Sequence, residues 1–514
     1  MMLQPPVSPA DLPERSWPVS LRSRVTWDTA LLAVGAWFIL AFVAVALLRL
    51  RYPFELEWME GGVVDHVRRI MAGHRLYVQP SLRFVPFIYP PLYFYLGALG
   101  SAIIGAGFLP LRLLSFAASL GCFSLIFALV VDESGHRRSA FLAVAFFAAC
   151  YPVSGGWYDL ARVDALYVCL LLGGAYLLRV RPTVAAWVMA AVLLALAFFT
   201  KQSAAIVAAP LLAYAVWMAP RRGLLATAVF AGIAVGGTWL LDRAHGGWYV
   251  YYVFRLPARI QQADAAAAAF WSRDLVPSIA IAGALGLAAL LPQRGSRPGR
   301  ALFYLLLASA LVTSAWLSRL HAAAHENVLI PAHAAVAVLL GLFLGRCWSE
   351  SARGRGRLPA HVLVLLFVQF GVLLFDPRHM LPSAEDAALG RLLLQRIASV
   401  PGDVWLPQHG YLGALAAKQT YAHSMAMYDI IRAGSPADRE RLIEEVRGNL
   451  AQRRFDLIIA DRVDRWFREE LNSAYQPVGP VFPSSSGFWP LTGLRLRPDV
   501  VYRPRPAPNC VTSR

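Results

Sequence analysis

The stretch TALLAVGAWFILAFVAVALL, residues 29–48, is an uninterrupted apolar run. A helix needs ~20 such residues to cross a bilayer. Similar runs recur along most of the chain, which has 514 residues, 58% of them hydrophobic and only 15% charged, with a mean hydropathy of +0.51. This pattern is typical of polytopic membrane proteins. The sequence therefore predicts an all-α membrane bundle of about eleven spans, with the first run as a retained signal anchor.

Basic residues collect in every second connection between these runs, as the positive-inside rule describes. The net charge of +17 has this explanation, so we expect no nucleic-acid partner. The alternation predicts a cytoplasmic N-terminal segment, residues 1–26, and a transmembrane domain over residues 27–375. It also requires a single net crossing between residues 89 and 131, so residues 89–105 are expected to be re-entrant or interfacial. The segments predicted to face outward are residues 50–88, 154–164, 200–203, 242–275 and 318–327.

The composition changes from Asp376 onward, where no spanning run remains and about half of the acidic residues lie. Residues 403–407 and 455–460 have strand patterns, and residues 436–452 have helical composition. We predict a small soluble α/β domain over residues 376–514, on the extracytoplasmic side.

The acids Glu55, Glu57 and Glu60 follow the first span almost at once. Anions at a membrane interface are costly unless they bind a partner or take part in chemistry. Residues 60–71 have helical periodicity with valines on one face, which predicts a helix lying on the bilayer with Glu60 in its membrane-facing seam. The alternative is that Glu60 only complements the dipole at the start of that helix.

The remaining outward segments supply both acids and bases. A carboxylate can act as a general base on a hydroxyl or hold a cation, and arginine or lysine can bind a departing phosphate. This combination suits transfer of a group from a phosphate leaving group. Transport is the competing interpretation, but it would place ionisable residues near the middle of the spans, where few occur. The candidate residues are Glu57, Glu60, Arg162, Asp164, Lys201, Arg255, Arg259, His321, His325, Glu326 and Asn327.

Short motifs in a fixed order add a family resemblance. They are Met59-Glu60-Gly61, Tyr89-Pro90-Pro91-Leu92, Pro110-Leu111-Arg112-Leu113, Ala161-Arg162-Val163-Asp164, Thr200-Lys201-Gln202 and His325-Glu326-Asn327. Over residues 27–345 the chain resembles the GT-C glycosyltransferases, in particular the bacterial proteins similar to protein O-mannosyltransferases and the lipid A aminoarabinose transferase. The resemblance implies an inverting transferase of the bacterial inner membrane. Such an enzyme moves a monosaccharide from a polyprenyl phosphate to an envelope glycan, lipid or protein on the outer face.

The resemblance also implies roles for single residues. The family commonly has Asp-Glu before a small residue in the first outer loop, but here methionine, Met59, precedes Glu60. Glu57, one helical turn before Gly61, is therefore the expected base, with Glu60 as the other candidate and Asp164 as a supporting acid. Arg162, Lys201, Arg255 and Arg259 are expected to bind the donor phosphate, and His321, His325, Glu326 and Asn327 to line a substrate pocket.

Two further possibilities stay open. A divalent cation would find acids from two segments, although no ligand set in the sequence requires one. The methionine at position 59 leaves room for a non-catalytic membrane partner, and a lipid-linked glycan ligase or transporter is the other alternative class.

Overall fold

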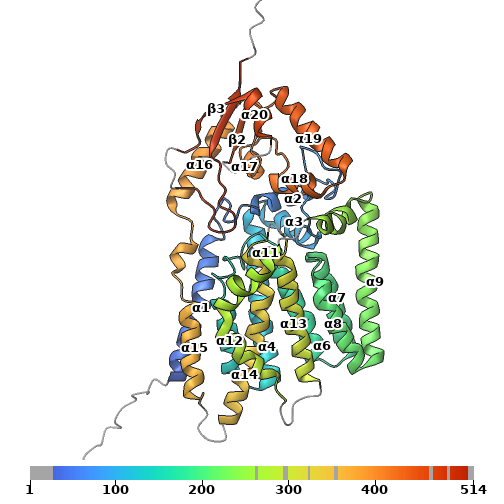
Figure 1. Cartoon of the computed structure of the whole chain (residues 1–514), viewed down its shortest axis with the longest axis vertical. Coiled ribbons are helices and arrows are strands. Elements are labelled where there is room, and N and C mark those ends of the chain that lie inside the picture. The colour runs from blue at the N-terminus through green and yellow to red at the C-terminus, as the bar shows by residue number, and fades with distance from the viewer. Residues whose placement is uncertain are drawn as a thin grey trace, which may run out of the picture.

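The computed structural model describes residues 27–260, 264–292, 299–321, 324–351, 357–461, 467–482 and 487–506. A long helical bundle carries a smaller α/β layer at one end (Figure 1). This confirms the predicted fold class. The bundle helices are α1 (Trp27–Arg49), α4 (Phe108–Ser134), α5 (Arg137–Ala149), α6 (Asp164–Val180), α7 (Val184–Thr200), α8 (Ala204–Met218), α9 (Pro220–Ala244), α12 (Val276–Leu287), α13 (Arg300–Arg319), α14 (Ile330–Ser351) and α15 (Ala360–Val372).

The helices of the described residues differ in how well they could cross a membrane alone. Six are long and apolar enough, or seven if the pair bent by 48° at residues 372–377 counts as one span. Helices α5 to α8 have only 13 to 17 residues. The chain is an integral membrane protein by this measure, and the count of eleven spans stays a prediction.

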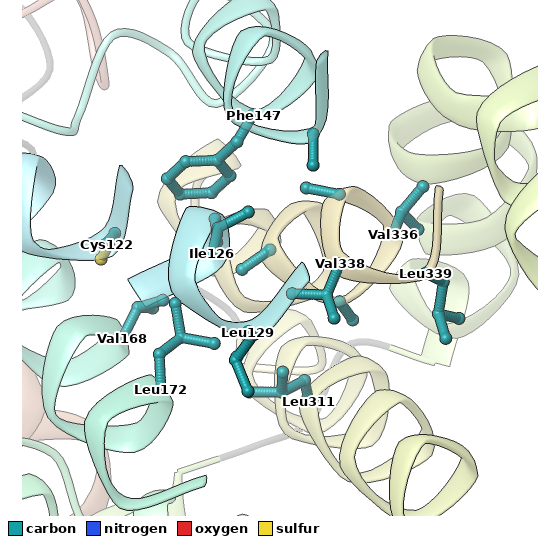
Figure 2. Close-up of a cluster of buried hydrophobic side chains, with 14 of the residues drawn as sticks. Cys122, Ile126, Leu129, Phe147, Val168, Leu172, Leu311, Val336, Val338 and Leu339 are labelled. Atoms are coloured by element: carbon teal, nitrogen blue, oxygen red, sulfur yellow. The ribbon is translucent and has the colours of Figure 1, made fainter. Parts of the chain in front are cut away.

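Helix α14 forms the centre of the bundle, and 94% of its most apolar window is buried. Lipid provides little hydrophobic driving force for helices to associate, so close van der Waals contact has to hold them together, and small residues permit that contact. A methyl group on Gly341 would lie 2.7 Å from both Ala143 and Val130, so α14 approaches α4 and α5 closely. Figure 2 shows the surrounding side chains: Val336, Val338 and Leu339 of α14 beside Ile126, Leu129, Phe147, Val168, Leu172 and Leu311.

Short elements cover the end of the bundle that faces the C-terminal tail, residues 376–514. They are α2 (Glu60–Met71), α3 (Leu92–Ile104), α10 (Trp248–Val250), η1 (Tyr251–Arg255), η2 (Pro257–Arg259), α11 (Asp264–Ala269), η3 (Phe270–Leu275) and η5 (Glu326–Leu329); η4 (Ala288–Leu290) follows α12. The helix predicted for residues 60–71 is confirmed with those bounds. Its surroundings differ from the prediction, because α2 lies between the bundle and the tail (Figure 1) and packs against α3, α4 and α17 (Gly410–Leu415).

The tail contains a four-stranded sheet in the order β1-β2-β4-β3. Strand β1 (Val404–Trp405) is parallel to β2 (Leu457–Ala460), while β4 (Val500–Pro504) is antiparallel to both β2 and β3 (Tyr475–Pro480). The strand patterns at residues 403–407 and 455–460 and the helical pattern at 436–452 are confirmed. The helical elements are η6 (Pro377–Met380), α16 (Ala384–Ala398), α17, α18 (Ser424–Ala433), α19 (Pro436–Ala451) and α20 (Arg468–Ala474).

Candidate active site

Three acids follow α1, in the first loop between α1 and α2 and at the first residue of α2, and each contacts a different partner. Glu55 contacts His409 of the tail, Glu57 contacts Arg162, and Glu60 contacts Arg112. The loop is fixed between α1 and α2, so neighbouring carboxylates occupy separate environments.

Glu60 is completely buried and has all its acceptor capacity used. Its oxygens lie 2.7 and 3.0 Å from the Arg112 guanidinium, and they accept the N–H groups of Leu56 at 2.8 Å and Ala161 at 2.7 Å. Burial alone would raise the pKa of Glu60, but Arg112 and the two N–H groups hold it below its usual value. The prediction of a membrane-facing Glu60 is wrong, because the side chain points into the protein, where it ties α2 to α4 and to the loop before α6.

Glu57 is equally buried but poorly satisfied. Its Oε2 lies 3.4 Å from Arg162 Nη1, and its Oε1 accepts no hydrogen bond from any described residue. Burial raises the pKa of Glu57 to about 8, against the opposing charge of Arg162. A carboxylate whose pKa lies near the working pH and whose oxygen is free to accept a proton has the properties of a general base.

Asp164 begins α6 and holds two side chains from other segments. Its Oδ1 accepts hydrogen bonds from Lys201 Nζ at 3.0 Å and from Asn327 Nδ2 at 3.1 Å, while Oδ2 has no partner among the described residues. This geometry makes Asp164 the group that positions the Lys201 ammonium.

The partners of Glu57 and Asp164, which are Arg162, Lys201 and Asn327, line a cavity of about 380 Å³ at the end of the bundle. All five segments predicted to face outward contribute to it, together with α18 of the tail. Apolar side chains form much of the wall, and Arg162 and Lys201 supply positive charge. Burial lowers the pKa of His321 and of His325, so these imidazoles are neutral hydrogen-bonding groups. The lining includes Met59, Ile88, Tyr89, Trp157, Arg162, Lys201, Gln202, Ile206, Pro257, Leu317, His321, His325, Asn327, Val328, Met425 and Asp429.

The structure does not bring every predicted residue to this cavity. Arg255 and Arg259 are exposed on the outside of the η1–η2 segment, and only Pro257 between them reaches the lining. Glu326 is exposed and lines a different cavity. Glu57, Glu60 and Asp164 do not line the cavity themselves. Arg162, the partner of Glu57, and Lys201, the partner of Asp164, line it instead.

Several important contacts were not predicted from the sequence. Arg112 has a detectable signal, since a charge inside an apolar run needs a buried partner. Tyr89 belongs to one of the motifs quoted above, but no pattern predicts that its hydroxyl lies 3.1 Å from Arg162 Nη2. Trp157, whose ring lies 5.0 Å from the same guanidinium, has no signal in the sequence. Their positions depend on the packing of loops that are distant in the sequence.

His409 connects the first loop to the tail. Its Nδ1 lies 2.6 Å from Glu55 Oε2 and its Nε2 lies 3.3 Å from Asp461 Oδ1. Burial alone would lower the pKa of His409, but the carboxylates of Asp461 and Glu55 raise it to about 10. A buried imidazolium therefore joins α17 and β2 to the loop that carries Glu57. Among the described residues, no three His, Cys, Asp or Glu side chains converge as a metal site.

Comparison with known protein families and solved structures identifies the fold of this chain. Residues 89–240 match the family model of dolichyl-phosphate-mannose-protein mannosyltransferases. The structure of ArnT from Cupriavidus metallidurans bound to undecaprenyl phosphate aligns with a TM-score of 0.58 at 14% identity, over 91% of this chain and 98% of that one. This chain has the GT-C fold.

A second ArnT structure supports the same alignment. ArnT from the same organism in the apo state aligns with a TM-score of 0.57 at 15% identity, over the same shares of both chains. No curated protein sequence matches the chain. The predicted resemblance to the GT-C glycosyltransferases is confirmed, and the alignment, which covers 91% of the chain, includes part of the tail as well as the bundle.

Proposed function

We propose that this chain is a membrane glycosyltransferase that moves a monosaccharide from a polyprenyl phosphate to an acceptor hydroxyl. The observation that carries the proposal is a pair of cations, the buried Arg162 and the partly buried Lys201, each paired with a carboxylate in the wall of a largely apolar cavity. A phosphate carrying a long isoprenoid chain has the matching chemistry. Arg162 and Lys201 would bind the phosphate, and the walls formed by Ile88, Ile206 and Leu317 suit the chain.

The comparisons support this donor class. ArnT, whose fold aligns over nearly the whole chain, has a structure with undecaprenyl phosphate, and the family model describes enzymes that use a dolichyl phosphate. The centre of the bundle is filled by apolar side chains (Figure 2), which favours chemistry at one end over transport through the middle.

The proposed reaction needs one base and one anion site. Glu57 takes the proton of the acceptor hydroxyl, and the hydroxyl oxygen attacks the anomeric carbon of the sugar from the face opposite the phosphate. The bond between that carbon and the phosphate oxygen breaks, its electron pair stays on the phosphate, and the configuration inverts. Lys201 and Arg162 stabilise the negative charge that grows on the leaving phosphate.

Lys201→Ala should weaken binding of undecaprenyl phosphate by roughly 10- to 150-fold, because one charged hydrogen bond is worth about 1.5–3 kcal/mol. Lys201→Arg, which keeps the charge, should retain most of the affinity. Titration of the purified full chain in nanodiscs, followed by lipid-phosphate-dependent thermal stabilisation, measures the effect.

Arg259→Ala is the matched comparison. The sequence assigns both Arg259 and Lys201 to the donor phosphate and so predicts a loss of affinity for undecaprenyl phosphate in either variant. The structure predicts a smaller loss of affinity for Arg259→Ala, because Arg259 is exposed and does not line the cavity. Wild-type affinity in Lys201→Ala would contradict the proposed donor site.

We also propose that the cavity and the tail face outward across a bacterial inner membrane. Helix α1 begins at the end of the bundle opposite the tail (Figure 1), and the basic connections alternate with the loops that line the cavity. A reporter that is active only outside the cytoplasm, fused after Arg514, should be active. A signal from a cytoplasmic reporter at that position would reverse the orientation.

A further inference from the structure

A second cavity, of about 860 Å³, lies where the bundle meets the tail. Its wall differs in chemistry from that of the proposed donor cavity, because charged groups of both signs face it. The side chains that define it are Arg273, Asp274, Glu326, Asp386, Trp489 and Arg495. Trp489 and Arg495 belong to a tail segment that also supplies Leu491, Thr492 and Gly493 to the lining.

This tail segment is bonded directly to the first loop. The N–H groups of Leu491 and Thr492 donate to the carbonyl oxygen of Leu56 at 2.8 and 3.3 Å. Trp157, which lines the donor cavity, donates its Nε1–H to Thr492 Oγ1 at 3.2 Å. Residues 491–493, which line the second cavity, and Trp157, which lines the donor cavity, therefore form a partition between the two.

Glu57 lies within that partition. Its Oε2 faces Arg162 on the donor side. Its Oε1, buried and without a hydrogen-bond donor among the described residues, lies on the side of Gly493, where a methyl group built on the glycine would be 3.2 Å away. Gly493 has φ of +74°, a conformation that favours glycine, and a methyl group there would also lie 2.8 Å from the Trp58 indole, so Glu57 Oε1 and Trp58 both pack against this glycine of the second cavity's wall.

We infer that the second cavity binds the acceptor, and that the acceptor is a carbohydrate with free hydroxyl groups; the inference rests on the proposed function. Hydroxyls both donate and accept hydrogen bonds, which fits a wall with carboxylates and guanidinium groups together. The ring of Trp489 lies against the guanidinium groups of Arg495 and Arg497, whose central carbons are 5.3 and 4.5 Å from its centroid. An indole and guanidinium donors therefore stand together at this wall, a combination that suits the ring and the hydroxyls of a sugar. A lipid chain would place hydrocarbon against the charged groups of Arg273 and Glu326, which is costly, and a polyanion would meet the carboxylates of Asp274, Glu326 and Asp386.

The inference also gives the path of the proton transfer, from the acceptor hydroxyl to Glu57. The acceptor hydroxyl reaches Glu57 Oε1 past Thr492 and Gly493 and gives its proton to that oxygen, so residues 491–493 move when the acceptor binds. The hydroxyl oxygen then forms its bond to the anomeric carbon on the donor side, and the phosphate leaves with the electron pair of the broken bond.

The test uses the purified full chain in nanodiscs and saturation-transfer NMR with neutral methyl glycosides of glucose, mannose, galactose and arabinose. At least one glycoside should bind the wild type, and Trp489→Ala should weaken that binding by roughly five- to tenfold, the size of one aromatic contact. Glu326→Gln, at an exposed position, should also weaken it and serves if Trp489→Ala fails to fold. Glu350→Gln, at the far end of α14, should bind like the wild type.

Binding of undecaprenyl phosphate separates the two proposals. Trp489→Ala should keep that binding, and Lys201→Ala should lose it while keeping the glycoside. If no glycoside binds, or if binding is insensitive to both Trp489→Ala and Glu326→Gln, the acceptor assignment is overturned although the donor site stands. If glycosides bind but undecaprenyl phosphate does not, the proposed function fails instead.

Discussion

Glu57→Gln should lower turnover by about 10²–10⁴-fold, the usual cost of losing a general base. Glutamine keeps the shape of the side chain but cannot take a proton. The variant should still fold, because burial already raises the pKa of Glu57 to about 8 and the neutral side chain suits the site at least as well as the charged one. Release of undecaprenyl phosphate from a sugar-loaded donor, measured per mole of folded protein, gives the rate.

The pH dependence provides a second measurement. A base must be deprotonated to work, so the rate should rise with pH up to about 8, where Glu57 loses its proton, and then level off. Glu350→Gln is the matched control, since Glu350 pairs only with Arg346 at the other end of the bundle in the described structure. Near-normal turnover in Glu57→Gln would move the base to Asp164 or to the tail, or remove catalysis from the protein's role.

Glu60→Gln should lower the stability of the folded protein by about 3–5 kcal/mol, the cost of breaking a buried ion pair from one side. The Arg112 guanidinium, which is fully buried, would lose its charged partner. Because Glu60 also accepts the N–H groups of Leu56 and Ala161, the position of the whole first loop depends on it. Thermal unfolding in nanodiscs measures the loss.

Glu350→Gln again supplies the comparison. It breaks the Arg346–Glu350 pair, whose glutamate side chain is 64% exposed, and surface pairs are worth about 0–1 kcal/mol. Equal, small effects of the two substitutions would show that Glu60 does not anchor the loop. A large loss of turnover in Glu60→Gln with unchanged stability would instead return Glu60 to the role of base.

The two glutamates therefore have separable predicted signatures, although they lie three residues apart. Glu57→Gln should affect the rate and spare the fold, while Glu60→Gln should affect both. The motif around Met59 cannot distinguish them, because a sequence pattern shows which acids are present but not which of them has a partner. Arg112 makes that distinction, and it reaches Glu60 from α4 across more than fifty positions.

The sequence alone determined the class of the protein, the ends at which its polar residues gather and the helix at residues 60–71, since apolar length, basic loops and helical period are local properties. The predicted outward segments do meet, and Arg162, Lys201, His321, His325 and Asn327 line one cavity. Tertiary structure alone decided which acid has a close cationic partner and why Arg255 and Arg259 stay outside the cavity. It also decided how Leu491 and Thr492 of the tail bond to Leu56, next to Glu57. Ion pairs and partitions of this kind join segments far apart in the chain, so their geometry depends on the packing of the whole fold and leaves no periodic pattern in the sequence.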